Sequence, residues 1–127
     1  MSVRILVLED NPDRQEAFRR RYPDAVIVAT APACIERLAE PWDLVYLDHD
    51  LGGNRLPGSD REDCGMVAVR YIIEHRPEHL EPAKFVIHSA NHHRAQIMVA
   101  DLRRAGYDAK LRSFINLLPE LQRNEAQ

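Results

Sequence analysis

Near its start the sequence reads Ile5-Leu6-Val7-Leu8-Glu9-Asp10-Asn11-Pro12. The apolar residues of Val3–Leu8 follow one another without polar alternation, which is typical of a strand buried on both faces of a sheet. Asn11 favours the start of a helix as its N-cap, and Pro12 suits the first helical position. This passage therefore predicts a buried strand, an acidic pair at its end and a helix directly behind it.

The same succession of strand and helix recurs along the chain. Further apolar runs predict strands at Ala25–Ala29, Leu44–Leu47, Phe85–Ile87 and Ala109–Leu111. Caps and prolines predict helices that start near Asn11, Thr30, Met66, Asn91 and Asn116, the second of them stopped by Pro41. Strands that alternate with helices form a parallel sheet covered on both faces. We expect an α/β, flavodoxin-like fold: a three-layer sandwich around a five-stranded parallel sheet of order 2-1-3-4-5, with its ligand site at the carboxyl ends of strands 1 and 3.

Composition excludes several other classes of protein. A length of 127 residues suits one domain, and 45% hydrophobic residues are too many for a disordered chain. No apolar run approaches the ~20 residues of a membrane span, and no signal peptide is recognisable. Two cysteines without metal-type spacing fit a reduced compartment, and a net charge of −3 does not favour nucleic acid. We expect residues 1–127 to form one cytoplasmic domain, with no membrane attachment and no sequence-specific DNA binding.

Polar side chains gather at the predicted carboxyl ends of three strands. Glu9 and Asp10 follow the first strand, Asp48, His49 and Asp50 follow the third, and His88, Ser89 and Asn91 follow the fourth. Carboxylates that converge on one crevice repel each other unless a cation is present. Oxygen ligands without cysteine favour Mg²⁺, or Mn²⁺ in its place. A cation site therefore competes with the simpler interpretation that these acids only cap helices.

The histidines near these strand ends are candidates for proton transfer. A phosphoryl-transfer site needs a group that exchanges a proton near neutral pH, and histidine does so. We expect at least one of His49 and His88 to be functional, while each alone also has a structural explanation. Strand alternation argues against His88, because it directs His88 away from Ser89 and Asn91 and toward the opposite helix layer.

Two other parts of the chain carry weaker signals. The connection from Leu51 to about Cys64 is glycine-rich, charged and long for its position, so it is either a functional flap or an insertion. His75 and His79 surround the end of the third predicted helix, where we expect them to be solvated surface residues.

These residues resemble the receiver domains of two-component response regulators over nearly the whole chain. Ile5–Asn11 is similar to the family's first strand with its acidic metal-binding pair. Trp42–Asp48 resembles the third strand, which ends in the phosphoacceptor aspartate, and Phe85–Ala90 resembles the fourth, with its Ser/Thr followed by alanine. The resemblance implies a divalent cation bound near Asp48.

Other residues depart from the common receiver pattern. Receivers follow their fifth strand with a Lys-Pro pair, where this chain has Lys110-Leu111-Arg112-Ser113, so Lys110 or Arg112 would substitute as the phosphate-binding cation. Asp48-His49-Asp50-Leu51-Gly52 together with His88-Ser89-Ala90-Asn91 looks more like a divergent branch, the cyclic-phosphate-processing receiver domains. That branch is proposed to use the receiver pocket as an enzyme that acts on cyclic phosphates.

The leading interpretation is a metal-dependent phosphodiesterase-like site for a phosphate-containing small molecule or a cyclic-phosphate end. Asp10 and Asp48 would bind the cation directly, Glu9 would bind it through water, and Asp50 would be a further ligand or a base. Asp48 could instead attack the phosphorus itself. The remaining assignments are His49 or His88 as the group that protonates the leaving ribose oxygen, and Ser89 and Asn91 as the groups that orient the phosphate.

Two other functions stay open on the sequence. One is an atypical single-domain response regulator that a histidine kinase phosphorylates on Asp48; the departure from the Lys-Pro pair counts against its usual switching mechanism. The other is a non-catalytic pseudo-receiver that binds a partner protein. The retained acids count against the pseudo-receiver, because clustered carboxylates without a cation only lower stability.

Overall fold

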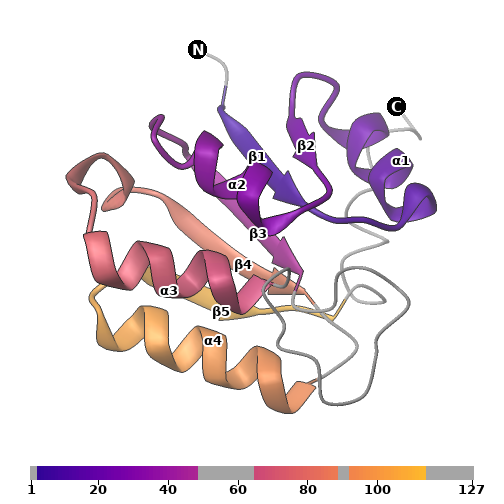
Figure 1. The fold of residues 1–127 in the computed structure, drawn as a ribbon. Helices are drawn as coiled ribbons and strands as arrows, with labels where there is room; N and C mark the ends of the chain where they lie inside the picture. The colour runs from indigo at the N-terminus through magenta and orange to yellow at the C-terminus, as the bar shows by residue number, and fades with distance from the viewer. Residues whose placement is uncertain (1–2, 49–64, 89–91, 114–127) are drawn as a thin grey trace.

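The structure, a computed structural model, describes residues 3–48, 65–88 and 92–113, whose arrangement is drawn in Figure 1. The elements are β1 (Ile5–Leu8), α1 (Pro12–Arg21), β2 (Val26–Val28), α2 (Ala31–Arg37), β3 (Leu44–Asp48), α3 (Gly65–His75), the 3₁₀ turn η1 (Glu78–Leu80), β4 (Lys84–His88), α4 (His92–Arg104) and β5 (Asp108–Leu111). Every helix in the described ranges is too short or too polar to cross a membrane.

The strands form one parallel sheet in the order β2-β1-β3-β4-β5, which confirms the predicted flavodoxin-like topology. In the register, Leu8 of β1 lies opposite Leu47 of β3, and Asp48 lies opposite His88 of β4. The carboxyl ends of these three neighbouring strands therefore reach the same level of the sheet. Side chains that leave them on one face are consequently close neighbours.

Helices cover both faces of the sheet (Figure 1). On one face, α2, α3 and α4 pack on a core that includes Leu6, Leu8, Leu47, Phe85 and Ile87. On the other face, Phe18 of α1 packs on Ile5, Val7, Tyr46 and Val86. Because strand side chains alternate, the residues two positions after Val7, Tyr46 and Val86 also point to the α1 face. Those residues are Glu9, Asp48 and His88.

Local signals explain where the helices begin and end. The Asn11 side chain accepts hydrogen bonds from the backbone N–H groups of Asp13 and Arg14, at 2.9 and 3.1 Å, so it is the N-cap that the sequence predicts. After α4 the chain turns at Gly106, whose φ of +99° is a conformation that favours glycine. The helix expected after Asn91 is confirmed as α4, which starts at His92. The Asn91 cap itself and the helix expected near Asn116 lie outside the described residues.

Two expectations from the sequence were wrong in detail. The helix that starts after Thr30 ends at Arg37 rather than continuing to Pro41, and Leu38 forms its C-cap. His79 is not a solvated residue: it is partly buried, and its Nε2 lies 2.8 Å from the backbone oxygen of Leu38. The last carbonyls of a helix lack partners within the helix, and η1 brings His79 to one of them. His75 is exposed, as expected.

Phe18 joins α1 to the sheet beneath the predicted site, and its removal should be costly. Its ring is fully buried and lies edge-on to Tyr46, with 4.9 Å between the ring centroids. Phe18→Ala should lower the free energy of unfolding by about 3–5 kcal/mol, as expected for loss of a buried phenyl ring. Urea denaturation measures this change, with the exposed Val3→Ala as the control, which should cost less than about 0.5 kcal/mol.

Candidate active site

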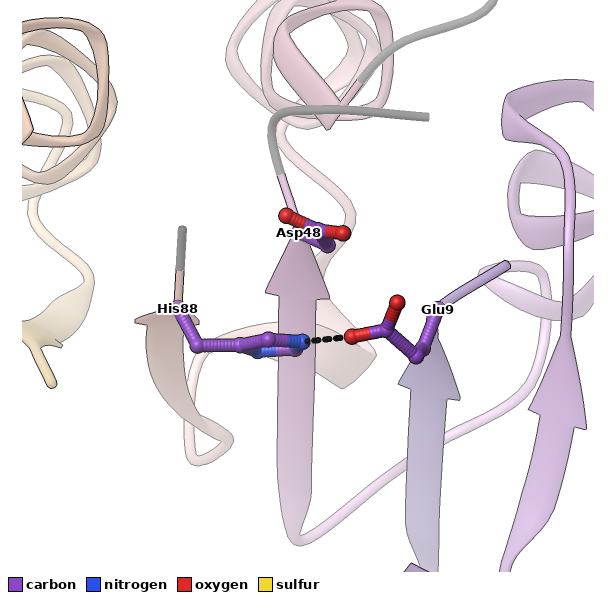
Figure 2. Close-up of side chains that lie close together, drawn as sticks. All are labelled: Glu9, Asp48 and His88. Atoms are coloured by element: carbon purple, nitrogen blue, oxygen red, sulfur yellow. Dashed lines mark hydrogen bonds and ion pairs between the residues drawn. The ribbon is translucent and has the colours of Figure 1, made fainter. Parts of the chain in front are cut away.

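Three ionisable side chains meet at the carboxyl edge of the sheet: one directly follows β1, and the other two are the last residues of β3 and β4. Glu9, Asp48 and His88 are 0%, 1% and 0% exposed. Each offers one potential ligand atom, and these atoms all lie within 4.8 Å of one another. Figure 2 shows the Glu9 and His88 side chains meeting across β3, with Asp48 at the tip of that strand. The group is thus a buried cluster that a metal ion could occupy.

Glu9 is held in place through most of its polar atoms. Its Oε1 accepts a hydrogen bond from His88 Nε2 at 3.0 Å, and its Oε2 accepts one from the Asn11 backbone N–H at 3.0 Å. Its backbone oxygen accepts a hydrogen bond from Gln15 Nε2 at 2.6 Å. Arg14 Nη1 lies 3.9 Å from Oε1. The first turn of α1 therefore fixes the Glu9 carboxylate beside His88.

These contacts decide the charge state of the buried carboxyl group. Burial by itself raises the pKa of Glu9. The hydrogen bond and charge of His88, the Asn11 N–H and the Arg14 guanidinium act in the opposite sense, and together they hold the pKa of Glu9 below its ordinary value. Glu9 is therefore an anion at neutral pH, although water does not reach it.

His88 is enclosed by aromatic side chains of the α1 face. Its ring centroid lies 5.5 Å from that of Phe18 and 6.2 Å from that of Tyr46. Strand alternation places His88 on the α1 face of the sheet, opposite the layer of α3 and α4. The same alternation brings Glu9 and Asp48 onto that face, so His88 lies inside the acidic cluster rather than remote from it.

Asp48 is fixed from the opposite side by the start of α3. Gly65, the first residue of α3, packs directly on the backbone carbonyl of Asp48, and a Cβ at Gly65 would collide with that carbonyl. The Met98 Cε of α4 would lie 2.9 Å from the same Cβ. Gly65 therefore lies in direct contact with the backbone of Asp48, and only glycine allows this close approach.

The remaining predicted site residues are placed less directly. Asp10 follows Glu9 and is half-buried. Lys110 of β5 is exposed and pairs with Val86, below the level of His88, whereas the Arg112 backbone N–H donates to Ile87 O at 2.9 Å. The other four candidates lie outside the described residues: His49, Asp50, Ser89 and Asn91.

The sequence predicted that the acidic residues lie close together, but it did not predict the contacts that hold them in position. Counting by two from Val7, Tyr46 and Val86 along their strands would have placed Glu9, Asp48 and His88 on one face. Nothing in the sequence singled out Gln15 or Arg14 as neighbours of Glu9, because the direction of α1 relative to the strand end is a tertiary property. Gly65 carried no signal apart from its position after a long connection.

Comparison with known families and structures agrees with this topology. The sequence profile of the cyclic-phosphate processing receiver domain matches residues 4–104. No curated protein matches the chain. Among solved structures, the Mn²⁺-bound form of the response regulator Rcp1 is 17% identical, with a TM-score of 0.63, and the match covers 98% of this chain and 93% of that one.

Two further similar structures contain a response regulator and the receiver domain of another. A response regulator from Thermotoga maritima is 16% identical with a TM-score of 0.57, and the match covers 100% of both chains. A third similar structure holds the receiver domain of Ssk1 from Saccharomyces cerevisiae together with the histidine phosphotransfer protein Ypd1. The match is 15% identical with a TM-score of 0.58, and it covers 95% of this chain and 87% of that one. At these identities the comparison establishes the fold.

Gly65→Ala tests whether the start of α3 supports Asp48. The added methyl group must displace Asp48 or α3, so we expect a loss of about 1–3 kcal/mol in the free energy of unfolding, as for an overpacked core. Binding of Mn²⁺, measured by calorimetry, should weaken at the same time. Gly106→Ala is the matched control: its Cβ meets nothing within 4 Å, so only the positive φ costs stability and Mn²⁺ binding should not change. Equal Mn²⁺ affinity in the two variants would contradict the supporting role.

Acidification should weaken the fold through Glu9. Its pKa is lower in the folded than in the unfolded chain, so its contribution to stability is complete above the unfolded value and is lost as the pH falls through the folded value. Urea denaturation without divalent cations should therefore show Glu9→Gln less stable than the wild type at pH 7, with the difference narrowing below pH ~4.5. The exposed Glu74→Gln is the control for removal of any one carboxyl group. A difference that stays constant over this range would rule out the stabilised carboxylate.

Proposed function

The chain belongs to the family of cyclic-phosphate processing receiver domains, and we propose that it hydrolyses a cyclic phosphate in a pocket that holds a divalent cation. The observation that carries this proposal is the burial of Glu9 and Asp48, together with His88, in one cluster. The cluster lies where β1 and β3 end, which is the edge at which flavodoxin-like folds bind ligands.

The donor atoms of the cluster suit a divalent cation. Buried carboxylates are costly unless positive charge lies beside them. Glu9 and Asp48 provide oxygen ligands, and we assign Asp10 and Asp50 as further ones, because oxygen ligands suit Mg²⁺ and Mn²⁺. The response regulator Rcp1, whose fold this chain shares, has a Mn²⁺-bound form. A cation bound here supplies positive charge that stabilises the phosphoryl oxygens of the substrate.

The proton transfers are assigned to residues that follow β3. Hydrolysis forms a bond between a water oxygen and phosphorus and breaks one ester bond of the ring, so the water loses a proton and the leaving ribose oxygen gains one. We assign Asp50 to the first transfer and His49 to the second. A general acid must lie within hydrogen-bonding reach of the leaving oxygen. His88 is fully buried with its Nε2 on Glu9, so it is a poorer choice for that role.

The phosphate itself is assigned to three residues at the ends of β4 and β5. Ser89 and Asn91 follow His88 directly in sequence and supply polar side chains. We prefer Arg112 to Lys110 because of their positions along the sheet. The backbone N–H of Arg112 donates to Ile87 O, which places Arg112 near the level of the cluster, whereas Lys110 pairs with Val86, two residues before His88. A guanidinium group also matches two phosphate oxygens at once.

A response regulator phosphorylated on Asp48 is the second candidate. The position of Asp48, the last residue of β3 in a receiver topology, favours it. In that case the partner is a histidine kinase or a phosphotransfer protein of the kind that Ssk1 was crystallised with. The two functions differ in outcome, because the regulator keeps its phosphoryl group on Asp48 and the enzyme releases a product.

The test is incubation with Mn²⁺ or Mg²⁺ and a panel of 2′,3′-cyclic and 3′,5′-cyclic nucleotides, followed by chromatography. We expect turnover to a phosphomonoester. His49→Gln should lower the rate by about 10²–10⁴-fold, as for loss of a general acid. Asp48→Asn should abolish turnover. Lys84→Ala, an exposed residue at the start of β4 and far from the cluster, should leave the rate unchanged.

Parallel incubation with acetyl phosphate separates the candidates. Mass spectrometry that finds a phosphoryl group retained on Asp48, with no cyclic-phosphate turnover, would overturn the hydrolase in favour of the regulator. Absence of both outcomes would leave the partner-binding pseudo-receiver.

A further inference from the structure

Glu9 and His88 place two donor atoms at the spacing of neighbouring ligands on one cation. Glu9 Oε1 and His88 Nε2 are 3.0 Å apart. Two ligands that meet at right angles, each about 2.1 Å from a cation, are about 3.0 Å apart. Hydrogen-bonded pairs share this spacing, so the distance becomes informative only together with the third member of the cluster.

Asp48 is that third member. Its carboxylate lies within 4.8 Å of both other donor atoms, and it comes from the strand between the strands that carry them. Three donors from the ends of β1, β3 and β4 therefore lie close together, with Glu9 and His88 meeting across β3 and Asp48 at its tip (Figure 2). A hydrogen bond between Glu9 and His88 needs no second carboxylate beside it, whereas a set of three metal ligands does.

We propose that His88 is itself a metal ligand through Nε2, alongside Glu9 and Asp48, and that it makes the site selective for a first-row transition-metal ion such as Mn²⁺ over Mg²⁺. The cation takes the place of the proton between Nε2 and Glu9, which is released to solvent, so that the bound imidazole is neutral with its remaining proton on Nδ1. This inference rests on the proposed function only for the presence of a cation. Mg²⁺ is a hard cation that takes oxygen ligands and keeps several waters, so an imidazole nitrogen is unfavourable to it. Imidazole suits first-row ions such as Fe²⁺ and Zn²⁺ best, and affinity for a given site that contains nitrogen rises from Mn²⁺ toward Cu²⁺. Mn²⁺ is therefore the weakest-binding ion of the series, and it serves as the probe because its electron spin reports its ligands.

Both outer members of the cluster are already held in position to bind. The His88 ring is confined by Phe18 and Tyr46, so it has little freedom to turn away. Glu9 keeps the Asn11 N–H on Oε2, which leaves Oε1 to face the cation without losing the second hydrogen bond. Ligands that are oriented by their own partners in this way bind metal more tightly.

Pulsed electron paramagnetic resonance on the Mn²⁺-loaded protein tests the inference directly, because the electron spin of Mn²⁺ reports the nuclei of its ligands. We expect a nitrogen signal that changes when the protein carries ¹⁵N-labelled histidine. His88→Gln should remove this signal and should lower Mn²⁺ affinity, measured by calorimetry, by at least about 10-fold. Mg²⁺ affinity should fall much less. His75→Gln, which replaces an exposed histidine on α3, is the matched control and should retain the signal.

The other outcomes overturn the inference in distinguishable ways. Bound Mn²⁺ without a histidine signal means that the ligands are all oxygens, which contradicts a ligand role for His88 and leaves the proposed function standing. If Mn²⁺ does not bind at millimolar concentration, the cluster is not a cation site, and both the proposed function and the ligand role of His88 are contradicted. Even if His88→Gln does not fold, a labelled wild-type protein without a histidine signal overturns the inference. A signal that persists in His49→Gln supports it, and one that is lost there overturns it.

Discussion

Glu9 and His88 bring a carboxylate and an imidazole into contact in a part of the protein that water does not reach. An isolated carboxylate at such a depth would be driven to take up a proton. Here its partners hold the pKa of Glu9 below its ordinary value, and the group stays charged beside Asp48. The geometry of the site depends on this contact, because it fixes the side chains that border Asp48 across β3.

The flavodoxin-like fold makes that contact available. Neighbouring parallel strands end at one level, and the helix that follows β1 turns its first residues back over Glu9. On the other side, α3 starts against the backbone of Asp48. Glu9 and Asp48 are therefore positioned by helices and strands, whereas His49, Asp50, Ser89 and Asn91 follow β3 and β4 in the sequence and lie outside the described residues. Such a division is common in enzymes, where the scaffold holds the ligands and the connections carry the chemistry.

The sequence predicted the topology well because its signal is local. Continuous runs such as Val3–Leu8 and the cap at Asn11 specify strands and helices, and few arrangements of five such units are compatible with short connections. The acids at the strand ends were predicted for the same reason. The partners of Glu9 were not predicted, because its hydrogen bond to His88 joins residues 79 positions apart. Two predictions were wrong, the extension of the second helix to Pro41 and the solvated His79, because contacts between distant parts of the chain decided both.

Crystals grown with Mn²⁺ and measured for anomalous scattering test the central claim, a cation site formed by the buried cluster. We expect one strong anomalous peak within bonding distance of the carboxylates of Asp48 and Glu9. The peak should disappear in crystals of Asp48→Asn grown under the same conditions. A peak bound only by surface residues, or no peak in a well-diffracting crystal of the wild-type protein, would contradict the account.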